Sequence, residues 1–376
     1  MHVILLYSGN PCPAMLEIGY IAVNRNIEVE LILIDRAQAD IKIDTTLVNY
    51  PISCIYSPYN GIGLWRLLTF PVTFLKIAGQ LFKKSKKHSV VMTNTIDTLF
   101  VARIVKLFCD IRIRHQVRDL HSLQLADGLL SRFLKKFEAW LLKACEQLVY
   151  SAPAFYDQYY KDIYRGPVVL LENLPRTDPW TNFRRRPLEP DDFKVGYIGI
   201  VRYMNPLINL VGALERLSID GPRYTALFAG GGNAAEVQKH VRTPDLFNFI
   251  GRFEYTSEVA KLHHDVDLIY AVYDRFDRNC QIAMPTKFYE ALITKIPIMV
   301  SRDTFVGSLV EEMGIGIAVD GENVDALIAA FTEARVENSW YAKARARLDD
   351  LNIQDWYDMY QKALDAVIAD EVKHWP

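Results

Sequence analysis

Short apolar runs alternate with helix-length segments along the first half of the chain. The runs that predict buried strands are 2–7, 27–35, 89–92, 111–117, 147–151 and 168–171. The first of these runs leads through a turn at 8–11 into a predicted helix that ends near residue 24. Strands that alternate with helices in this way form βαβ units with parallel strands. The pattern therefore predicts an α/β domain, which we place at residues 1–185.

The alternation stops at 177–192, where three prolines and three consecutive arginines replace the apolar periodicity and indicate a linker. It then restarts and predicts strands at 194–201, 224–229, 247–250, 267–273, 296–301 and 316–319, and helices at 207–217, 257–265, 285–293, 324–335 and 339–348. We place a second α/β domain at 193–353, and we predict that a helix at 354–369 packs back on the first domain within the segment 354–376. Ligands of such sheets bind beyond the carboxyl ends of the strands, which predicts a cleft between the two domains.

Composition is that of an ordinary globular protein. Of the 376 residues, 50% are hydrophobic, which is enough for two cores. The net charge of −2 argues against a dedicated nucleic-acid binder, which normally carries a basic excess. Five cysteines fit neither a disulfide framework nor a zinc site, and they are Cys12, Cys54, Cys109, Cys145 and Cys280. Because the apolar start also lacks the basic region of a signal peptide, we expect a cytoplasmic protein.

Charge is distributed unevenly between the two halves. Residues 1–185 carry 23 lysines and arginines against 16 acidic residues, a balance of +7, and the remaining residues balance at −9. The most apolar helix-length stretch, 63–82, is interrupted by Arg66 and Lys76, so it is too short to span a bilayer, which takes about 20 apolar residues. A lysine cluster follows it, namely Lys83, Lys84, Lys86 and Lys87. Two interpretations stay open: peripheral contact with an anionic membrane, or an amphipathic helix packed on a sheet.

The segment 279–301 carries the most informative chemistry. Pro285 suits the start of a helix, where its missing N–H costs nothing. The free N–H groups and the dipole at such a start form an anion site. Lys287 opposes the dipole in the first turn, a penalty that a bound diphosphate would reverse, and Glu290 is spaced to accept hydrogen bonds from a ribose. The alternative is a surface helix with a Lys–Glu pair at i, i+3.

This segment and several others resemble the donor site of GT-B glycosyltransferases, in particular those of family 4. The similar blocks are Tyr197-Ile198-Gly199 with Arg202, Phe228-Ala229-Gly230-Gly231-Gly232, Phe249-Ile250-Gly251-Arg252, Val266-Asp267-Leu268, and Asn279 through Pro285-Thr286-Lys287-Phe288-Tyr289-Glu290 to Pro297. Glu172-Asn173-Leu174-Pro175 also resembles a block at the end of the family's acceptor domain. The blocks follow the family's order and spacing over nearly the whole chain.

The resemblance implies two Rossmann-like domains that face each other across a cleft, with the acceptor in the first and a nucleotide-diphosphate sugar in the second. It implies a UDP-linked donor, no cofactor, no metal and retention of configuration. It further implies a glycan or lipid-linked acceptor at the cytoplasmic membrane, in the synthesis of a capsule, exopolysaccharide or O-antigen. The donor residues that it implies are Gly199, Arg202, Gly230, Gly231, Gly232, Arg252, Phe253, Asn279, Pro285, Thr286, Lys287 and Glu290.

Two positions depart from the family pattern. The family commonly has a second glutamate eight residues before Glu290, where this chain has Ile282. A lysine expected shortly after Arg202 is also absent. We therefore expect Arg202 and Lys287 to stabilise the negative charge of the leaving diphosphate, and Asn279 to contact the sugar or phosphate.

On the acceptor side, Arg118-Asp119-Leu120-His121 follows a predicted strand at its carboxyl end. It resembles an aspartate-leucine-aromatic turn of bacterial polysaccharide transferases. We predict Asp119 and His121 as catalytic residues with Lys287, although Asp119 could instead cap the next helix. The remaining residues predicted on this side are Gly9, Asn10 and Arg118. Glu138 and Glu146 are interpreted as surface charges on a long amphipathic helix.

The triplet Asp265-Val266-Asp267 has the form of a metal-binding DxD motif. Its predicted position between a helix and a strand favours a structural role, and no metal is expected.

Two rival functions share the predicted fold. A nucleotide-sugar epimerase would need no acceptor. A non-catalytic nucleotide-sugar-binding subunit would bind through Arg202, Lys287 and Glu290 without turnover, and the missing first glutamate keeps this alternative open.

Overall fold

The computed structural model describes residues 1–9, 11–36, 43, 46–57, 64–189, 191–219 and 221–372, with the backbone alone for 64–68. The chain forms two compact units, one made of Met1–Glu172 with Asp358–Pro376 and the other of Asn173–Tyr357. Within the described ranges, no helix has both the length and the apolar character that a bilayer span requires.

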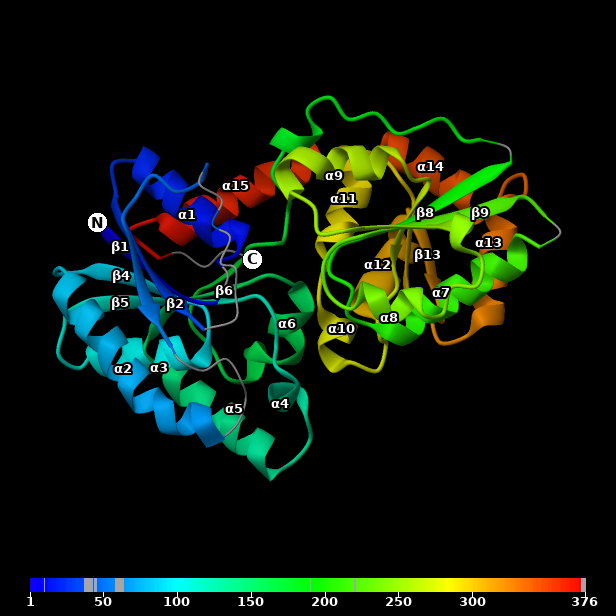
Figure 1. Ribbon diagram of the computed structural model, residues 1–376. Coiled ribbons are helices and arrows are strands. Elements are labelled where there is room, and N and C mark those ends of the chain that lie inside the picture. The colour runs from blue at the N-terminus through cyan, green and yellow to red at the C-terminus, as the bar shows by residue number, and fades with distance from the viewer. Residues whose placement is uncertain are drawn as a thin grey trace. The chain divides into compact units, whose positions relative to one another are not determined.

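The first unit is built on a seven-stranded parallel sheet in the order β3-β2-β1-β4-β5-β6-β7. Its strands are β1 (His2–Ser8), β2 (Glu28–Asp35), β3 (Ile52–Tyr56), β4 (Ser89–Thr93), β5 (Ile111–Val117), β6 (Cys145–Tyr150) and β7 (Val168–Leu170). Its helices are α1 (Pro13–Asn24), α2 (Leu64–Lys84), α3 (Ile96–Val105), α4 (Ser122–Leu125), α5 (Leu129–Leu142), α6 (Pro153–Gln158) and η1 (Tyr160–Asp162). In Figure 1, α1 and α15 (Gln354–Ile368) cover one face of this sheet and α2, α3 and α5 cover the other.

The predicted strands of this unit are confirmed. Helices cover both faces of the sheet, so its central strands are buried on both sides. Every residue of β1 and β4 is buried, so these strands appear in the sequence as continuous apolar runs. The sequence did not predict β3, an edge strand in which one residue of five is fully buried. An edge strand with polar and exposed positions gives no such run.

The second unit repeats this architecture with six parallel strands in the order β10-β9-β8-β11-β12-β13. The strands are β8 (Asp192–Ile198), β9 (Arg223–Ala229), β10 (Phe247–Gly251), β11 (Leu268–Ala271), β12 (Ile298–Ser301) and β13 (Gly316–Val319). The helices are η2 (Asp178–Trp180), α7 (Met204–Leu217), α8 (Ala234–Gln238), η3 (Pro244–Leu246), α9 (Tyr255–His264), α10 (Arg278–Ile282), α11 (Thr286–Thr294), α12 (Phe305–Met313), α13 (Val324–Ala334) and α14 (Trp340–Asp350). A large apolar core packs α7 and α13 against the sheet.

Both sheets reverse their strand order once, between β1 and β4 and between β8 and β11. At such a switch point the loops that leave the two central strands turn in opposite directions and leave room at the carboxyl edge, where ligands of α/β proteins bind. The topology therefore marks one candidate edge in each unit.

Arg114 of β5 fixes the end of α15 on the first unit. Its guanidinium is buried, donates hydrogen bonds to the carbonyls of Val367 and Ala369, the latter at 2.7 Å, and pairs with Glu146 at 2.7 Å. The last carbonyls of a helix have no partner within the helix, so Arg114 satisfies two of them. Glu146 lies in β6, and its interpretation as a surface charge on a helix was wrong.

Replacing Arg114 by leucine is expected to lower the free energy of unfolding by about 3 kcal/mol, because Glu146 and the two carbonyls lose their partner. Arg112→Leu is the matched control on the same strand. Its main partner Asp370 is 75% exposed, and Glu146, 3.9 Å from its Nε, keeps its closer bond with Arg114 in this variant, so the loss should stay below about 1 kcal/mol. Urea denaturation measures both, and equal losses would contradict the helix-capping role.

Candidate functional site

Lys287 is a nearly buried cation at the switch point of the second sheet. It is the second residue of α11, and 8% of its surface is exposed. Its Nζ donates to the Tyr273 hydroxyl at 3.1 Å and lies 4.9 Å from the centre of the Tyr197 ring. Within the described part of the chain, no carboxylate forms an ion pair with it. The buried carboxylate of Glu290 interacts with this charge only beyond ion-pair distance. Because a buried charge that is incompletely compensated is costly, this geometry favours an anionic ligand.

The same edge carries two glycine turns that leave the backbone open. Gly199 follows β8 with φ +142°, and a Cβ there would lie 2.7 Å from Lys287 Nζ. Gly230 follows β9 with φ +144°, and a Cβ there would collide with the Gly199 carbonyl. The Gly199 N–H bonds to the Ala229 carbonyl at 2.7 Å, and the Gly230 N–H bonds to the Gly251 carbonyl at 2.6 Å. These bonds hold the loops after β8, β9 and β10 together beside Lys287.

The predicted arginines lie on the same loops. Arg202 is exposed after β8, and no described carboxylate forms an ion pair with its guanidinium. Arg252 is exposed after β10, and its side chain lies over Gly231, where a Cβ would be 3.1 Å from its Cγ. Gly232 pairs with Val201 in a parallel bridge. The structure thus brings the predicted glycines and both arginines to one edge, with the half-buried Phe253 beside them.

Asn279 lies on α10, a short helix that precedes α11. Asp277 caps this helix and accepts hydrogen bonds from the backbone N–H groups of Asn279 at 2.8 Å and Cys280 at 3.2 Å. The Cys280 thiol donates to the Tyr203 hydroxyl at 3.0 Å, which ties α10 to the start of α7. Pro285 is the N-cap of α11, and Thr286 is its first residue.

The carboxylate of Glu290 is held by other side chains inside the second unit. Its carboxylate is 4% exposed, accepts a hydrogen bond from the Tyr255 hydroxyl at 2.7 Å and lies 3.4 Å from His263 Nε2. Burial would raise the pKa of Glu290, but His263, Lys287 and Tyr255 together hold it below its usual value. His263 Nδ1 faces the Val259 carbonyl at 2.9 Å, so both ring nitrogens of His263 face oxygen atoms. Ribose binding by Glu290 stays a prediction.

The sequence did not reveal Tyr255 and His263 as partners of Glu290. Both lie on α9, about 30 residues before α11, and no spacing links them to it. Their contact depends on how the two helices pack.

In the first unit, two of the predicted catalytic residues, Asp119 and His121, border a cavity of about 680 Å³. Asp119 and His121 lie on its polar side with Asn94 and Asp97, at the carboxyl ends of β4 and β5. The apolar part of its lining comes from α2, α3 and α5 and consists of Phe70, Phe100, Leu134 and Phe137. The structure therefore brings Asp119 and His121 into one cavity.

His121, and not Asp119, is the N-cap of α4. Its Nδ1 accepts the Leu123 N–H at 3.2 Å, so the neutral ring carries its proton on Nε2. Arg118 is half-buried and does not line the cavity. The Gly9 N–H bonds to the Ile34 carbonyl at 3.0 Å, and Asn10 lies outside the described residues.

Glu138 is a buried anchor of this cavity, so its interpretation as a surface charge was wrong. Its Oε2 accepts hydrogen bonds from Gln124 at 2.9 Å and Tyr159 at 2.7 Å, and its Oε1 accepts one from Tyr160 at 2.8 Å. Gln124 Oε1 in turn accepts the backbone N–H of His121 at 2.8 Å. The chain of bonds from Glu138 to His121 holds the predicted catalytic loop in place. Burial raises the pKa of Glu138 despite these donors.

The DxD-like triplet lies at the opposite, amino-terminal edge of the second sheet. Asp267 accepts the Lys194 N–H at 2.9 Å and lies 3.2 Å from the Arg186 guanidinium. Asp265 is the C-cap of α9. Asp267 thus joins β11 to β8, away from the candidate edge.

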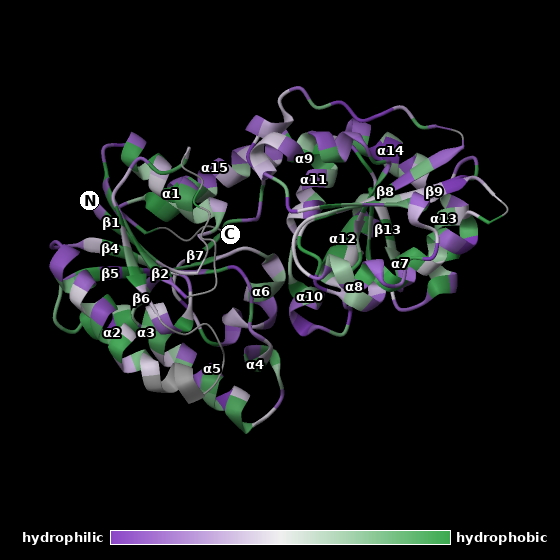
Figure 2. Ribbon diagram, viewed as in Figure 1, coloured by the Kyte–Doolittle hydropathy of each residue, from purple (hydrophilic) through white to green (hydrophobic). Residues whose placement is uncertain are grey.

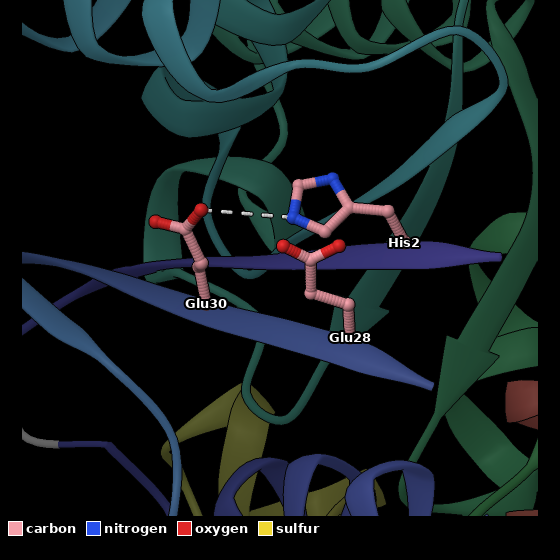
Figure 3. Close-up of side chains that lie close together, drawn as sticks. All are labelled: His2, Glu28 and Glu30. Carbon is pink, nitrogen blue, oxygen red and sulfur yellow. Dashed lines mark ion pairs between the residues drawn. The ribbon is translucent and has the colours of Figure 1, made fainter. Parts of the chain in front are cut away.

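Figure 3 shows His2, Glu28 and Glu30, whose ligand atoms lie within 4.8 Å of one another, the one group of described residues spaced to hold a metal. His2 Nε2 lies 3.7 Å from Glu30. Lys84 pairs with Glu30 and Lys86 pairs with Glu28, so lysines already compensate both carboxylates. We assign no metal to this cluster.

Comparison with known proteins supports the sequence-based expectation. No protein-family model matches the chain. The succinoglycan biosynthesis protein ExoL of Rhizobium meliloti (strain 1021) is 24% identical over 287 residues, which cover 72% of this chain and 70% of ExoL. The structure of Anabaena HepE in complex with UDP and glucose is similar with a TM-score of 0.73 and 13% identity, over 98% of this chain and 99% of HepE. WaaG, a glycosyltransferase involved in lipopolysaccharide biosynthesis, gives a TM-score of 0.64 and 13% identity, over 98% of this chain and 100% of WaaG. The predicted GT-B fold is confirmed.

As the pH rises, the Glu138→Gln variant is expected to lose less free energy of unfolding than the wild type. A raised folded-state pKa means that the folded protein holds this proton more tightly than the unfolded chain, so stability present at low pH is lost as the pH rises above the ordinary glutamate pKa of about 4.3. Glutamine keeps the shape and has no proton to lose. Urea unfolding between about pH 4.5 and pH 8 measures the difference between variant and wild type.

Glu236→Gln is the control with the opposite sign, because Lys239 lowers the pKa of the exposed Glu236. That variant should lose stability relative to wild type as the pH rises. If the free energies of unfolding of the wild type and Glu138→Gln changed in parallel with pH, the raised pKa of Glu138 would be contradicted.

Proposed function

We propose that this protein is a glycosyltransferase that transfers a sugar from a nucleotide-diphosphate sugar to a saccharide acceptor. The observation that supports this function most directly is Lys287, a cation 8% exposed at the N-terminus of α11 without a carboxylate partner in the described chain. A diphosphate would supply the missing negative charge. The helix dipole, which is unfavourable to Lys287 alone, would then act on the same anion.

The donor side would act mainly on the leaving group. When the bond between the sugar and the diphosphate breaks, negative charge accumulates on the phosphate oxygens. Lys287 and Arg202 would stabilise that charge, with backbone N–H groups of the loops that contain Gly199 and Gly230. Because these groups are held in place by packing and backbone hydrogen bonds, little reorganisation accompanies the reaction.

A UDP-linked sugar is the proposed donor. HepE, which shares the fold, was solved with UDP and with UDP-glucose. The described edge of the second unit holds the cations and open backbone that a nucleoside diphosphate needs. Retention of configuration and the absence of a metal requirement remain part of the proposal.

The proposed acceptor is a sugar of a growing bacterial surface polysaccharide, carried on a lipid at the cytoplasmic face of the membrane. The similarity to ExoL supports a role in polysaccharide synthesis. The cavity of the first unit supports the acceptor chemistry, because Asp119 and His121 line it together with Phe70, Phe100 and Phe137. Asp119 would orient the acceptor hydroxyl, and the Nε2–H of His121 would donate to the acceptor. An epimerase would have no use for this cavity.

Lys287→Met is expected to weaken UDP binding about 10- to 100-fold, the effect of losing a charged hydrogen-bond donor. The same variant should be as stable as the wild type or more stable without ligand, because it removes a buried charge. Isothermal titration calorimetry and urea unfolding measure the two quantities. Lys194→Met, at the opposite end of β8 and 40% exposed, is the control and should bind UDP normally. Unchanged UDP affinity in Lys287→Met would reject the donor site.

Asp119→Asn is expected to lower turnover about 100-fold or more while UDP affinity stays unchanged, because Asp119 borders the cavity of the first unit and not the donor edge. UDP release from UDP-glucose, with bacterial membranes as the acceptor source, measures turnover. Asp162→Asn, an exposed carboxylate of the same unit, is the control. Equal turnover in Asp119→Asn and wild type would remove Asp119 from the mechanism.

A further inference from the structure

His115 is a buried histidine that shares the cavity of the first unit with Asp119 and His121. It lies near the carboxyl end of β5 and is 2% exposed. Successive side chains of a strand point to opposite faces of a sheet. Arg114 therefore points toward α15, whose end it fixes, and His115 points to the face that α2, α3 and α5 cover. Val117, two residues along the strand, lines the same cavity.

The protein uses one ring nitrogen of His115 and leaves the other to the cavity. Nδ1 lies 2.8 Å from the hydroxyl oxygen of Thr93, the residue opposite His115 on β4. Nε2, at the tip of the ring, forms no hydrogen bond with the described residues and faces the cavity. The next positions on the same face of β5, Ile113 and Val117, are apolar. Because a polar atom without a partner in a buried place costs stability, a ligand explains this histidine better than packing does.

Burial keeps the ring of His115 neutral. It lowers the pKa of His115 to about 4, and Asp97 and Thr93 oppose that shift only in part. A neutral imidazole has one N–H and one lone pair, and the hydroxyl of Thr93 can either donate to Nδ1 or accept from it. Nε2 therefore presents a single donor or a single acceptor to the cavity. A hydroxyl group of a ligand can pair with either, because it both donates and accepts.

The charged side chains of the cavity disfavour a phosphate. Asp97 and Asp119 contribute carboxylates to the lining. Among the described lining residues, Arg36 is the one lysine or arginine, and its guanidinium lies 3.2 Å from Asp97, which already compensates its charge. Like charges repel, and salt screens them less in a partly buried site than in open water. An uncharged ligand therefore fits this lining better than an anion.

Three phenylalanines form an aromatic surface in the same cavity. They are Phe70, Phe100 and Phe137, which come from α2, α3 and α5, and Figure 2 shows the hydrophobic stretches of these helices. The ring centre of Phe100 lies 6.3 Å from that of Phe70 and 5.9 Å from that of Phe137, so the three rings are continuous. A sugar ring has C–H groups on its faces and hydroxyls at its edge. It can pack on the aromatic rings while its hydroxyls bond to polar groups of the lining.

We propose that His115 binds the acceptor, through a hydrogen bond between Nε2 and a hydroxyl of an uncharged sugar unit that packs on Phe100 and Phe137. The identification of this sugar as the acceptor rests on the proposed function. The binding of a neutral sugar in the cavity does not. The phosphate of a lipid carrier would then lie outside the cavity, because the carboxylates of the lining repel it.

The first test measures binding to the full chain without nucleotide. The probes are n-octyl β-glucoside, n-octyl β-galactoside and n-octyl phosphate, which have the same apolar tail, each below the concentration at which it forms micelles. Nuclear magnetic resonance of isotope-labelled histidine reports on the ring nitrogens, and the signals missing from His115→Gln identify those of His115. The Nε2 signal of His115 should shift with at least one glycoside. Octyl phosphate should bind about tenfold less tightly.

Two variants separate Nε2 from Nδ1. The amide of asparagine reaches only the position of Nδ1, and the amide of glutamine reaches that of Nε2. His115→Asn should weaken glycoside binding about fivefold or more, and His115→Gln should stay within about twofold of the wild type. With bacterial membranes as the acceptor source, His115→Asn should raise the membrane concentration for half-maximal turnover by a similar factor, while UDP affinity stays unchanged.

His88→Asn is the matched control, a histidine of the same unit that precedes β4 and is 65% exposed, and it should behave as the wild type. Urea unfolding shows that each variant is folded. The proposal would be overturned by a wild type that binds neither glycoside, by octyl phosphate binding as tightly as the glycosides, or by equal losses in His115→Asn and His115→Gln. Failure of the wild type to bind UDP or to turn over UDP-glucose would reject the proposed function and leave the glycoside result standing.

Discussion

The second unit is organised around the ammonium group of Lys287. No described carboxylate lies within ion-pair distance of it, so its charge requires compensation, which the rings of Tyr197 and Tyr273 and the longer-range interaction with Glu290 provide in part. It also excludes a side chain at Gly199, whose carbonyl in turn excludes a side chain at Gly230. The buried ammonium group therefore accounts for Gly199 and for the two aromatic residues beside it, and the start of α11 has no side-chain cap.

The strand order places the candidate site of each unit at the same kind of sheet edge. Both sheets place their first strand in the middle and reverse direction beside it, so each has one carboxyl edge from which loops diverge. In the second unit that edge holds Lys287 and the glycine turns. In the first unit it holds the cavity with Asp119 and His121. The same topology thus positions the proposed anion site in one unit and a mixed polar and apolar cavity in the other.

The sequence predicts features that depend on neighbouring residues, and it misses those that depend on distant ones. Buried strands such as β1 and the glycine turn at 230–232 are visible because local composition determines them. Glu138 has the sequence appearance of a surface glutamate, and only its contacts with Tyr159 and Tyr160, more than 20 residues away, reveal an anchor. The pairing of Glu290 with His263 escapes prediction for the same reason.

The burial of Ile282 bears on the glutamate that the similar family commonly has at this position. Ile282 is 5% exposed at the end of α10, so this position packs in the interior, and a glutamate there would have to be buried. The groups proposed to stabilise the diphosphate lie on other elements: α11 carries Lys287, and the loop after β8 carries Arg202. Isoleucine at 282 therefore leaves the proposed leaving-group site intact. For this reason the missing glutamate does not by itself argue for the loss of transfer chemistry.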